Sequence, residues 1–264
     1  MSIRVYRGPH REMGGPSSMI KLSAWIFFAL GVISSSFWPF CPMDRKDSLT
    51  VFIILFFFLA STCHAFIWWD IAWAATFMIV SLAVSFSLLA INSATGLIFG
   101  DVTYTYRLGA QILFVPIVAP LIWSSSCYSA IVIARRISRG VFNGPLIAAL
   151  VATSLLAAVD SLFIKMKFHE WLTWVDKPNI YGNTPFKFFG SAFLITFIIM
   201  YLTGENSKND RYSTKMPILS YSWIIAFTLF SARILNNNVA EFAIVLTTMS
   251  LILVSFIYKS IKNN

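Results

Sequence analysis

Two acidic residues, Asp160 and Asp101, lie next to long apolar stretches and have the right chemistry for proton transfer. Asp160 stands in the apolar run LLAAVDSLFIKM. An ionised carboxylate in such a segment costs several kcal/mol unless it is paired, hydrated or protonated, and the protonated form is the state that donates a proton to a weakly basic substrate. Asp101 stands in a polar loop, where we expect it to stay ionised and serve as the base. The alternative for Asp160 is a structural ion pair with Lys165 or Arg107.

Polar side chains surround Asp101 in the stretch GLIFGDVTYTYRLG, which separates two apolar runs. This stretch supplies three candidate substrate-binding residues, Tyr104, Tyr106 and Arg107. Two further candidates stand at the ends of apolar runs, Asn92 before the stretch and Lys187 well after it.

The next apolar run, QILFVPIVAPLIWSSSCY, combines two prolines with an aromatic residue at helical spacing. Pro116, Pro120, Trp123 and Cys127 follow one another at intervals of four, three and four, which predicts one stripe of a helix. Each proline removes a backbone hydrogen bond, so we expect a bend that opens a concave, substrate-binding space. The alternative is a kink without function.

Aromatic residues gather in the stretch HEWLTWVDKPNIYGNTP. Trp171, Trp174 and Tyr181 suit a membrane surface simply because their rings are amphipathic. The functional alternative is that they line a pocket, together with Trp123 and the two loop tyrosines, and stabilise a positive charge through their ring faces.

The elements that must position these residues are transmembrane helices. Hydrophobic residues make up 58% of the 264 positions and charged residues only 12%, which indicates an integral membrane protein. A membrane helix needs roughly 20 apolar residues, and we expect eight spans, with seven as the alternative, at 22–40, 49–68, 71–92, 111–134, 145–165, 186–203, 217–235 and 239–257. The predicted fold is therefore an all-α, polytopic transmembrane bundle, a single domain over residues 21–260 that follows a flexible basic tail over residues 1–20.

The alternation of spans brings distant polar residues to one end of this bundle. The loop around Asp101 and the loop around Trp171 must emerge on the same face, whichever way the protein is oriented. Asp160, Arg233 and Glu241 are expected at that end as well. Lys and Arg are more frequent on the face that carries the two termini, which predicts that both termini are cytoplasmic.

Composition also argues against several classes of protein. The three cysteines are widely spaced, and only three histidines occur, so we expect neither a disulfide framework nor a metal site, and no cofactor. The net charge of +9 resides in loops and tails, where anionic lipid headgroups account for it, and nucleic acid is not an expected partner. His64 is expected to form a hydrogen bond between helices, away from the polar end.

Two blocks of residues resemble the carotenoid biosynthesis protein family, which includes carotenoid end-group hydratases acting on bisanhydrobacterioruberin and γ-carotene. The first block matches at Thr95-Gly96, Phe99-Gly100-Asp101, Tyr104-Thr105, Leu108-Gly109, Val115-Pro116, Pro120-Leu121 and Trp123. The second matches at Asp160, Trp171, Trp174, Tyr181-Gly182, Phe188 and Gly190. The chain departs from the family pattern at Val102, Ser161, Thr184, Lys187 and Ser191.

The resemblance implies an enzyme of a bacterial or archaeal cell membrane that acts on a lipophilic polyene or isoprenoid among membrane lipids. In the expected reaction, Asp160 protonates a terminal double bond, a tertiary carbocation forms, and water adds to it, with Asp101 taking the proton from water; such an enzyme is a lyase of the hydratase type. One alternative is a cyclase that uses the same protonation. Another is a membrane protein that binds lipids or polyenes without catalysis. The oligomeric state is left open.

Overall fold

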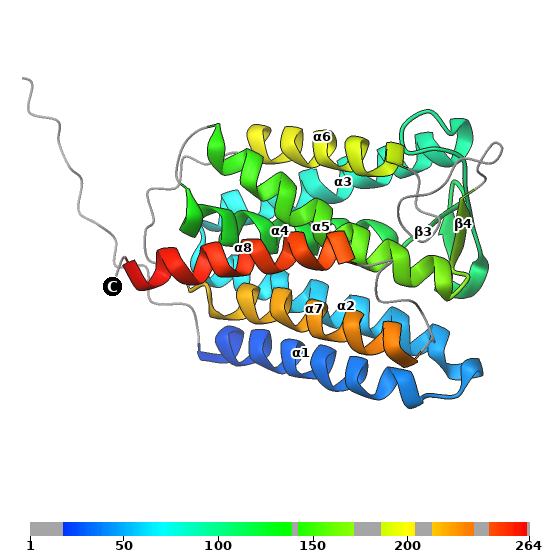
Figure 1. Ribbon diagram of the computed structural model, residues 1–264, viewed down its shortest axis with the longest axis horizontal. Helices are drawn as coiled ribbons and strands as arrows, with labels where there is room; N and C mark the ends of the chain where they lie inside the picture. Colours follow the sequence, from blue (N-terminus) through cyan, green and yellow to red (C-terminus); the bar gives the residue numbers. More distant parts are fainter. Residues whose placement is uncertain (1–17, 139–141, 172–185, 204–212, 235–242, 263–264) are drawn as a thin grey trace, which may run out of the picture.

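The computed structural model describes residues 18–138, 142–171, 186–203, 213–234 and 243–262, and within these ranges the chain forms eight α-helices (Figure 1). The helices are α1 (Ser18–Phe37), α2 (Met43–Trp68), α3 (Ile71–Thr95), α4 (Ala119–Ile137), α5 (Asn143–Lys165), α6 (Phe186–Leu202), α7 (Lys215–Ile234) and α8 (Ala243–Lys262). The predicted N-terminal tail lies outside the described residues, apart from its last three, which begin α1.

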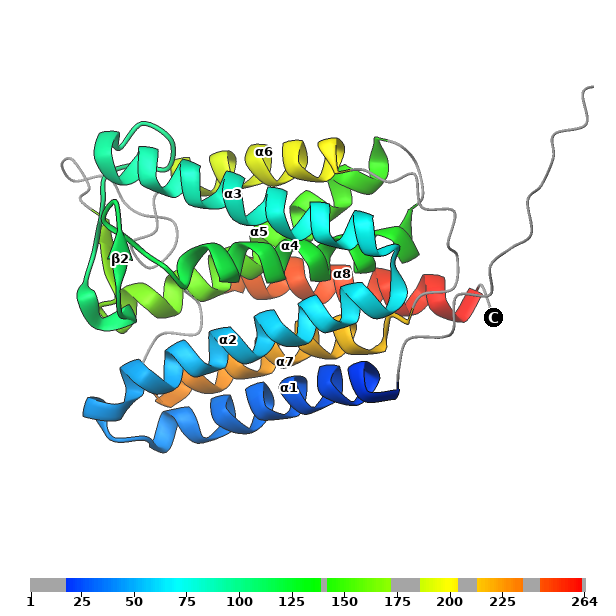
Figure 2. The same ribbon diagram turned by 180° about the vertical axis from the view of Figure 1, so that it is seen from behind.

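The helices run side by side along the long axis of the molecule, and successive helices alternate in direction (Figures 1 and 2). The short β-strands lie at one end of the bundle, which we call the cap end. The first residue of α1 and the last residue of α8 lie at the opposite end (Figure 1). The alternation predicted from the sequence is therefore present, and the side that faces the cytoplasm stays a prediction.

Four segments among the described residues are long and apolar enough to cross a membrane, as expected of an integral membrane protein. They are Ser18–Phe40, Met43–Trp68, Ile71–Thr95 and Asn143–Lys165, with 23 to 26 residues each. The first includes a short 3₁₀-helix, η1 (Trp38–Phe40), after α1. An α-helix rises about 1.5 Å per residue, so each segment matches a hydrocarbon layer of about 30 Å. The number of spans beyond these four stays a prediction.

Helix α4 is the central helix of the bundle and packs against α2, α3, α5, α6, α7 and α8. Most of its residues are buried, including Ser124, Ser126 and Ser129. Because α4 is surrounded by protein and not by lipid, it tolerates hydroxyl groups that a lipid-facing helix would avoid, provided that they find partners. The Oγ atoms of Ser124 and Ser81 lie 2.7 Å apart, joining α4 to α3.

A second polar contact joins α4 to α2, away from the cap end. The Nδ1 atom of His64 lies 2.6 Å from the hydroxyl oxygen of Tyr128, and the indole nitrogen of Trp69 donates to the same oxygen at 3.1 Å. All three side chains are buried. The prediction that His64 forms a hydrogen bond between helices is confirmed.

The predicted start of the fourth helix at residue 111 is wrong. Residues Gln111–Ile112 (β2) and Val115–Pro116 (β3) form a small antiparallel hairpin, and α4 begins only at Ala119. The two-residue turn between the strands has positive φ angles, 50° at Leu113 and 62° at Phe114, as a tight hairpin of this type requires.

The prolines explain this difference, and they do not bend a helix as predicted. Pro116 lacks the N–H group that a helix interior needs, and its ring disfavours helical backbone in the preceding residue. It is buried in β3, outside any helix. Pro120 stands in the first turn of α4, where the missing N–H costs nothing. The expected stripe of one bent helix from Pro116 to Cys127 is therefore not formed.

Candidate active site

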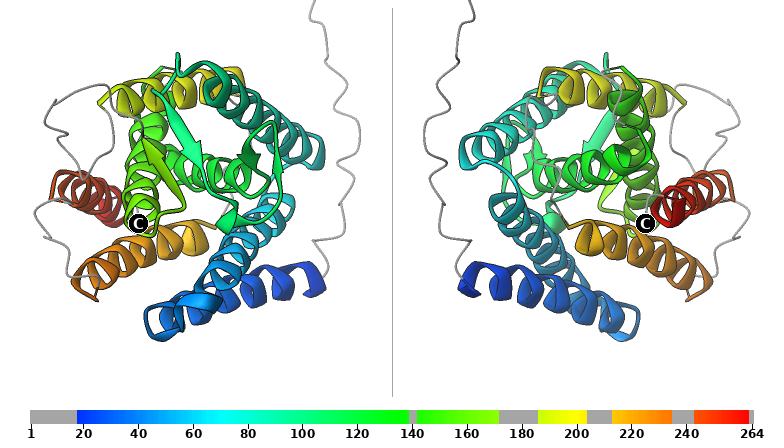
Figure 3. Two further views of the ribbon diagram at one scale, coloured as in Figure 1. Left: turned by 90° about the vertical axis from the view of Figure 1, so that its right-hand side faces the viewer. Right: turned by 90° about the vertical axis from the view of Figure 1, so that its left-hand side faces the viewer.

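The two polar loops meet at the cap end, as the alternation of spans predicts. Strand β1 (Val102–Tyr104) pairs antiparallel with β4 (His169–Trp171), with Val102 opposite Trp171 and Tyr104 opposite His169. The backbone N–H of Thr105 extends the pairing by donating to the carbonyl of Phe168 at 2.9 Å. These strands lie across the end of the bundle (Figure 3) and tie the loop after α3 to the segment after α5.

Asp160 lines a cavity of about 50 Å³ beneath this strand pair. Its side chain is 8% exposed, and it lies in the last two turns of α5. The cavity is lined by residues of α3, the loop that follows it, α4, α5 and α6: Leu89, Phe99, Tyr104, Leu108, Ala119, Ile122, Trp123, Leu156, Val159, Phe163 and Phe188. Asp160 is the one acidic group among these lining residues, and we call this space the Asp160 cavity.

Aromatic rings form much of the cavity wall. The ring centroids of Phe99 and Trp123 lie 5.5 Å apart, and those of Phe99 and Phe188 lie 5.8 Å apart. All three side chains are at most 6% exposed. Tilted rings at these separations pack favourably and present both faces and edges to the space between them.

Tyr104 is the second polar group that lines the Asp160 cavity. Burial is the main effect that raises the pKa of the Tyr104 hydroxyl above its ordinary value near 10, and the negative charge of Asp160, when that group is ionised, raises it further. The hydroxyl therefore stays protonated at neutral pH and is a hydrogen-bond donor towards the cavity. Tyr104, predicted as a substrate-binding residue, thus lines the same cavity as Asp160.

Asn92 shapes the loop that leads into β1 and does not line the cavity. Its side-chain oxygen accepts hydrogen bonds from the backbone N–H groups of Ile98, at 3.1 Å, and Phe99, at 2.7 Å. Its side-chain nitrogen donates to the carbonyl of Gly100 at 2.9 Å. With 1% of its surface exposed, Asn92 satisfies three backbone groups of the loop and holds Phe99 in the cavity wall.

Asp101 packs against the backbone of Gly96, which ends α3 in a left-handed conformation with φ of 63°. A Cβ atom on Gly96 would lie 1.8 Å from the Oδ1 atom of Asp101, so only glycine leaves room for this carboxyl group. Asp101 is partly buried on the cap and is not among the residues that line the Asp160 cavity.

Helix α6 also holds this loop, through two residues at which the chain departs from the family pattern. The Lys187 ammonium donates to the carbonyl of Gly96 at 3.3 Å, and the Ser191 hydroxyl donates to the carbonyl of Ile98 at 2.5 Å. Lys187 is exposed and lies outside the cavity. Lys187 and Ser191 therefore hold the loop after α3 in place through hydrogen bonds to its backbone.

Arg107 pairs with a residue that the sequence analysis did not identify. Its guanidinium donates to both carboxylate oxygens of Asp47, at 2.9 and 2.6 Å, and to the carbonyl of Met166. It also lies 5.1 Å from the ring centre of Phe168. Arg107 therefore connects the start of α2 to the segment after α5. The neighbouring Tyr106 is 77% exposed and is not part of the cavity wall.

The remaining predicted residues are divided between the cavity and other places. Trp123 lines the cavity, whereas Pro116 and Pro120 are buried close to it without lining it. Trp171 belongs to β4 by its backbone, and the structure does not describe its side chain. Trp174 and Tyr181 lie outside the described residues.

Phe163 and Leu156 are cavity residues that the sequence analysis missed. With Val159 and Asp160 they stand at positions 156, 159, 160 and 163, which is the spacing of one face of an α-helix. This spacing around the buried carboxylate was a usable signal, because the neighbours of Asp160 on its own helix face must share its surroundings.

The fold and the site define a class of protein: a helical membrane protein that holds a carboxyl group in an aromatic, apolar cavity beneath a polar cap. A family model described as "Carotenoid biosynthesis protein" matches residues 49–254, and the chain belongs to this family. No curated protein and no solved structure in the comparisons matches the chain. Family membership suggests a role in carotenoid biosynthesis, as an enzyme of that pathway, and is compatible with a lipophilic isoprenoid substrate.

Proposed function

We propose that the protein hydrates a terminal carbon–carbon double bond of a carotenoid or related isoprenoid by acid catalysis. The observation that carries the proposal is the position of Asp160, which is the one carboxyl group among the described residues that line this aromatic cavity within an apolar bundle. An alkene is a very weak base, so its protonation needs an acid held in a site from which bulk water is excluded. A buried carboxyl group meets this requirement.

The proposed reaction begins with transfer of the carboxyl proton of Asp160 to the less substituted carbon of a trisubstituted double bond. The π electrons form the new C–H bond, and the tertiary carbon becomes a cation. A water molecule adds its oxygen lone pair to that carbon, and the resulting oxonium loses a proton to the Asp160 carboxylate. The product is a tertiary alcohol, the acid is regenerated, and the substrate gains the atoms of one water.

The aromatic wall supports the cationic intermediate. The electron-rich faces of Trp123 and Phe99 attract a positive charge within about 6 Å, and this attraction is worth about 2 kcal/mol or more where water is excluded. Tyr104 and Asp160 provide two polar partners for one water molecule in the cavity, which is the minimum that an ordered buried water requires.

Asp101 is a second proposed proton acceptor. It lies outside the cavity wall, packed against Gly96, so it would take the proton through an intervening water. Asp160 itself needs no such relay, and the Asp101→Asn variant separates the two routes. Loss of turnover in this variant with an intact fold would favour Asp101 as the acceptor.

Cyclisation is the second candidate, and the composition of the cavity favours it. Apart from Asp160 and Tyr104, the described side chains that line the cavity are apolar or aromatic, and such a surface holds few waters. In this case an internal double bond of the substrate attacks the cation, a ring forms, and loss of a neighbouring proton gives an isomer of unchanged mass. Binding of the polyene without any chemistry is the third outcome that the experiment must separate.

The test uses the full-length protein in lipid nanodiscs with lycopene as the probe and mass spectrometry of the extracted pigment. A gain of one water supports hydration, whereas an isomer of the same mass supports cyclisation. Lycopene that is bound and recovered unchanged contradicts catalysis and supports the binding protein.

Two isosteric variants complete this experiment. Asp160→Asn keeps the shape of the side chain and should lower product formation by about 10² to 10⁴-fold, the usual contribution of a positioned acid. Asp70→Asn is the matched control: Asp70 is exposed and caps the start of α3 at the opposite end of the bundle, a position that asparagine also caps well. Full activity of Asp160→Asn would exclude Asp160 as the acid.

A further inference from the structure

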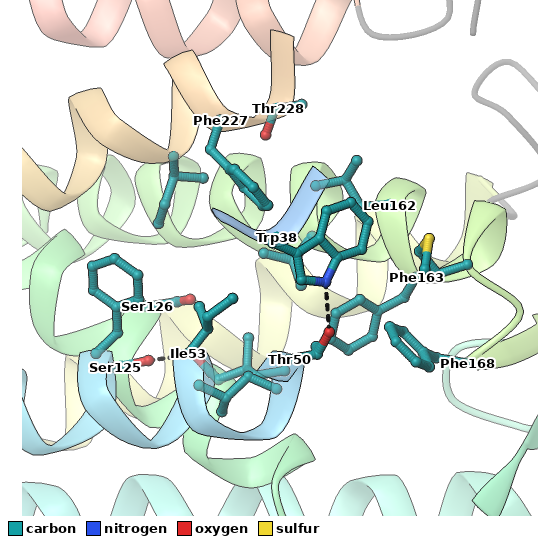
Figure 4. Close-up of a pocket in the computed structure, with 16 residues that line it drawn as sticks. Trp38, Thr50, Ile53, Ser125, Ser126, Leu162, Phe163, Phe168, Phe227 and Thr228 are labelled. Carbon is teal, nitrogen blue, oxygen red and sulfur yellow. Dashed lines mark hydrogen bonds between the residues drawn. The ribbon is translucent and has the colours of Figure 1, made fainter. Parts of the chain in front are cut away.

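A larger cavity of about 120 Å³ lies beside the Asp160 cavity and is lined mainly by residues of α2, α4, α5 and α7. We call it the α7 cavity (Figure 4). Its described wall is mostly apolar and includes two pairs of rings in edge-to-face contact. The centroids of Trp38 and Phe227 lie 5.9 Å apart, and those of Phe163 and Phe168 lie 5.2 Å apart. Such a wall suits a lipophilic ligand.

Three residues line both cavities: Ile122, Val159 and Phe163. They therefore form the wall that separates the two spaces. Phe163 is the largest of the three, so the position of its ring decides how closely the two spaces are connected. A ligand in the α7 cavity consequently lies next to a group that is bound at Asp160.

Four of the described residues that line the α7 cavity carry a hydroxyl group, and three of these groups are already bonded or enclosed. Thr50 accepts from the indole nitrogen of Trp38 at 2.9 Å and donates to a backbone carbonyl of its own helix at 2.8 Å. Ser125 donates to the carbonyl of Leu121 at 2.9 Å. Thr228 is 0% exposed and its hydroxyl oxygen is enclosed by protein, so an occupant of the cavity does not reach it.

The fourth hydroxyl group belongs to Ser126 on α4, and it has no hydrogen-bond partner among the described residues although the side chain is only 7% exposed. A serine within a helix often bonds to a carbonyl one turn back, as Ser125 does. Unlike the Thr228 oxygen, the Ser126 oxygen is not closed off by protein, and its remaining surface faces the α7 cavity. In Figure 4, Ser126 lies at the end of the cavity away from Trp38 and Phe168. Ser126 therefore offers a hydrogen-bond donor to an occupant of an otherwise apolar space.

A buried hydroxyl without a partner is costly and rare, and it is satisfied when the occupant of the cavity brings an oxygen atom to it. A lone water molecule is a poor occupant, because an ordered buried water needs at least about two polar partners, and the other described hydroxyl groups of the wall are engaged or enclosed. An oxygen atom on an apolar chain bonds to Ser126 while the carbon atoms of the chain fill the apolar space. The size of the cavity limits this chain, because an apolar cavity of about 150 Å³ holds a benzene molecule. The α7 cavity therefore accepts one short segment and not a whole carotenoid.

We propose that the α7 cavity binds a segment of an isoprenoid chain that carries a hydroxyl or carbonyl oxygen, and that Ser126 donates a hydrogen bond to this oxygen. Ser126 lies one helical turn, about 6 Å, along α4 from Ile122 in the dividing wall. The inference rests on the proposed function in one respect: the end group of the same chain lies at Asp160, across this wall. It adds to that function a preference for substrates that already contain oxygen.

The test measures binding without turnover, with the full chain in lipid nanodiscs. The probes are retinol, a polyene with one hydroxyl group, and the hydrocarbon that lacks only this hydroxyl. Energy transfer from tryptophan to the polyene reports binding, since Trp38 forms part of the cavity wall. Both probes also enter the lipid, so the quantity compared is the ratio of their dissociation constants, because partition into lipid affects this ratio equally in the wild type and in each variant.

Ser126→Ala is the decisive variant, because it removes the hydroxyl group and introduces a residue that suits a helix. It should lower the preference for retinol roughly two- to tenfold, the effect of one ordinary hydrogen bond, and leave the affinity for the hydrocarbon unchanged. Ser125→Ala is the matched control, since Ser125 lines the same cavity but its hydroxyl proton is used within α4. If Ser126→Ala retains the preference of the wild type, or if both variants lose it equally, Ser126 is not the donor.

Ile53→Phe tests whether the ligand occupies this cavity, because Ile53 lines it from α2. The larger ring takes up part of the space, adds no tryptophan to the energy-transfer signal and should weaken binding of both probes roughly tenfold. Unchanged binding would overturn the second site even if lycopene is converted by the wild-type protein. Conversely, absence of any conversion would overturn the proposed function and leave the binding results intact, so the two failures are distinguishable.

Discussion

Tyr104 and Asp160 line the same small cavity although 56 positions separate them in the sequence. Tyr104 reaches the cavity because β1 lies across the cap end, and Asp160 reaches it from within the membrane bundle. Burial and the nearby carboxyl group both keep the tyrosine hydroxyl protonated. The pair thus combines a proton donor with a hydrogen bond that helps to hold the substrate or a water molecule.

The raised pKa of Tyr104 predicts a specific loss of stability in alkaline solution. The folded protein keeps this proton to higher pH than the unfolded chain, whose tyrosine titrates near 10. Above pH 10 the unfolded chain alone releases the proton, so the free energy of unfolding falls with pH, by at most about 1.4 kcal/mol per pH unit. Below pH 10 the folded and the unfolded chain both keep this proton, so the full free energy of unfolding is retained there.

Unfolding measurements between pH 8 and 11 on the wild type and Tyr104→Phe test this expectation. Phenylalanine has no proton to lose, so the difference in unfolding free energy between the two proteins should change in favour of the variant above pH 10. The exposed Tyr106 provides the control, and Tyr106→Phe should follow the wild type. If the unfolding free energies of Tyr104→Phe and the wild type change with pH in parallel, the Tyr104 hydroxyl is not the group whose raised pKa lowers the stability.

Gly96→Ala should displace Asp101 from its position on the cap. The new methyl group would lie 1.8 Å from the Asp101 Oδ1 atom, and the φ angle of 63° is itself unfavourable for alanine, by about 1–2 kcal/mol. Gly190→Ala is the control, because Gly190 lies within α6 and an added Cβ atom there meets nothing within 4 Å.

We expect Gly96→Ala to be less stable than Gly190→Ala in denaturant unfolding by more than about 3 kcal/mol, the sum of the φ cost at Gly96 and the gain of alanine over glycine within a helix. If Asp101 takes part in turnover, Gly96→Ala should also reproduce the activity of Asp101→Asn, measured per amount of folded protein. A difference of about 3 kcal/mol or less would be the backbone cost alone, and it would show that the carboxyl group moves aside without cost.

The contact between Arg107 and Asp47 should stabilise the cap only modestly. Both side chains are about 30% exposed, and ion pairs in contact with solvent contribute about 0.2–1 kcal/mol. A double-mutant cycle with Arg107→Gln and Asp47→Asn should give a coupling free energy in this range. Arg107→Gln alone should cost more than Asp47→Asn, because it also removes the donor to the Met166 carbonyl.

Asp44→Asn is the control for this cycle. It removes a carboxylate from an exposed position in the first turn of α2, close in sequence to Asp47, and should show no coupling to Arg107→Gln. A coupling as large as that of Asp47 would mean that the general charge of the cap is responsible and not the specific pair.

Asn92→Leu should destabilise the protein strongly, because three backbone groups lose their partners at once. Leaving buried polar groups unsatisfied costs about 1–3 kcal/mol each, and some of these groups will reach water as the loop loosens, so we expect a loss on the order of 3 kcal/mol. The accompanying loosening of the loop should increase its cleavage in limited proteolysis.

Thr95→Val provides the comparison for Asn92→Leu. Thr95 is exposed, and its hydroxyl donates to the carbonyl of Ile91 and accepts from the backbone N–H of Leu97 at 3.3 Å. Because water can replace both exposed bonds, its replacement should change the unfolding free energy by less than about 0.5 kcal/mol. If both variants have the same small effect, the loop does not depend on Asn92.

Reasoning from the sequence succeeded where helix direction alone decides the outcome. Alternating spans require the loop of Asp101 and the segment of Trp171 to emerge together, and the pairing of β1 with β4 confirms this. It failed at Pro116, because hydropathy does not distinguish an apolar hairpin from an apolar helix. The partner of Arg107 was missed for another reason: Asp47 is 60 positions away, and no local pattern connects them.

Composition and hydropathy are sufficient to predict a helical membrane protein with an acidic residue buried near one end, because a hydrocarbon layer constrains segment length and charge so strongly. Which rings surround that acid depends on how α3, α4, α5 and α6 rotate and pack against one another. Side-chain packing of this kind arises from contacts between residues far apart in the chain, and therefore it becomes visible only in the folded protein.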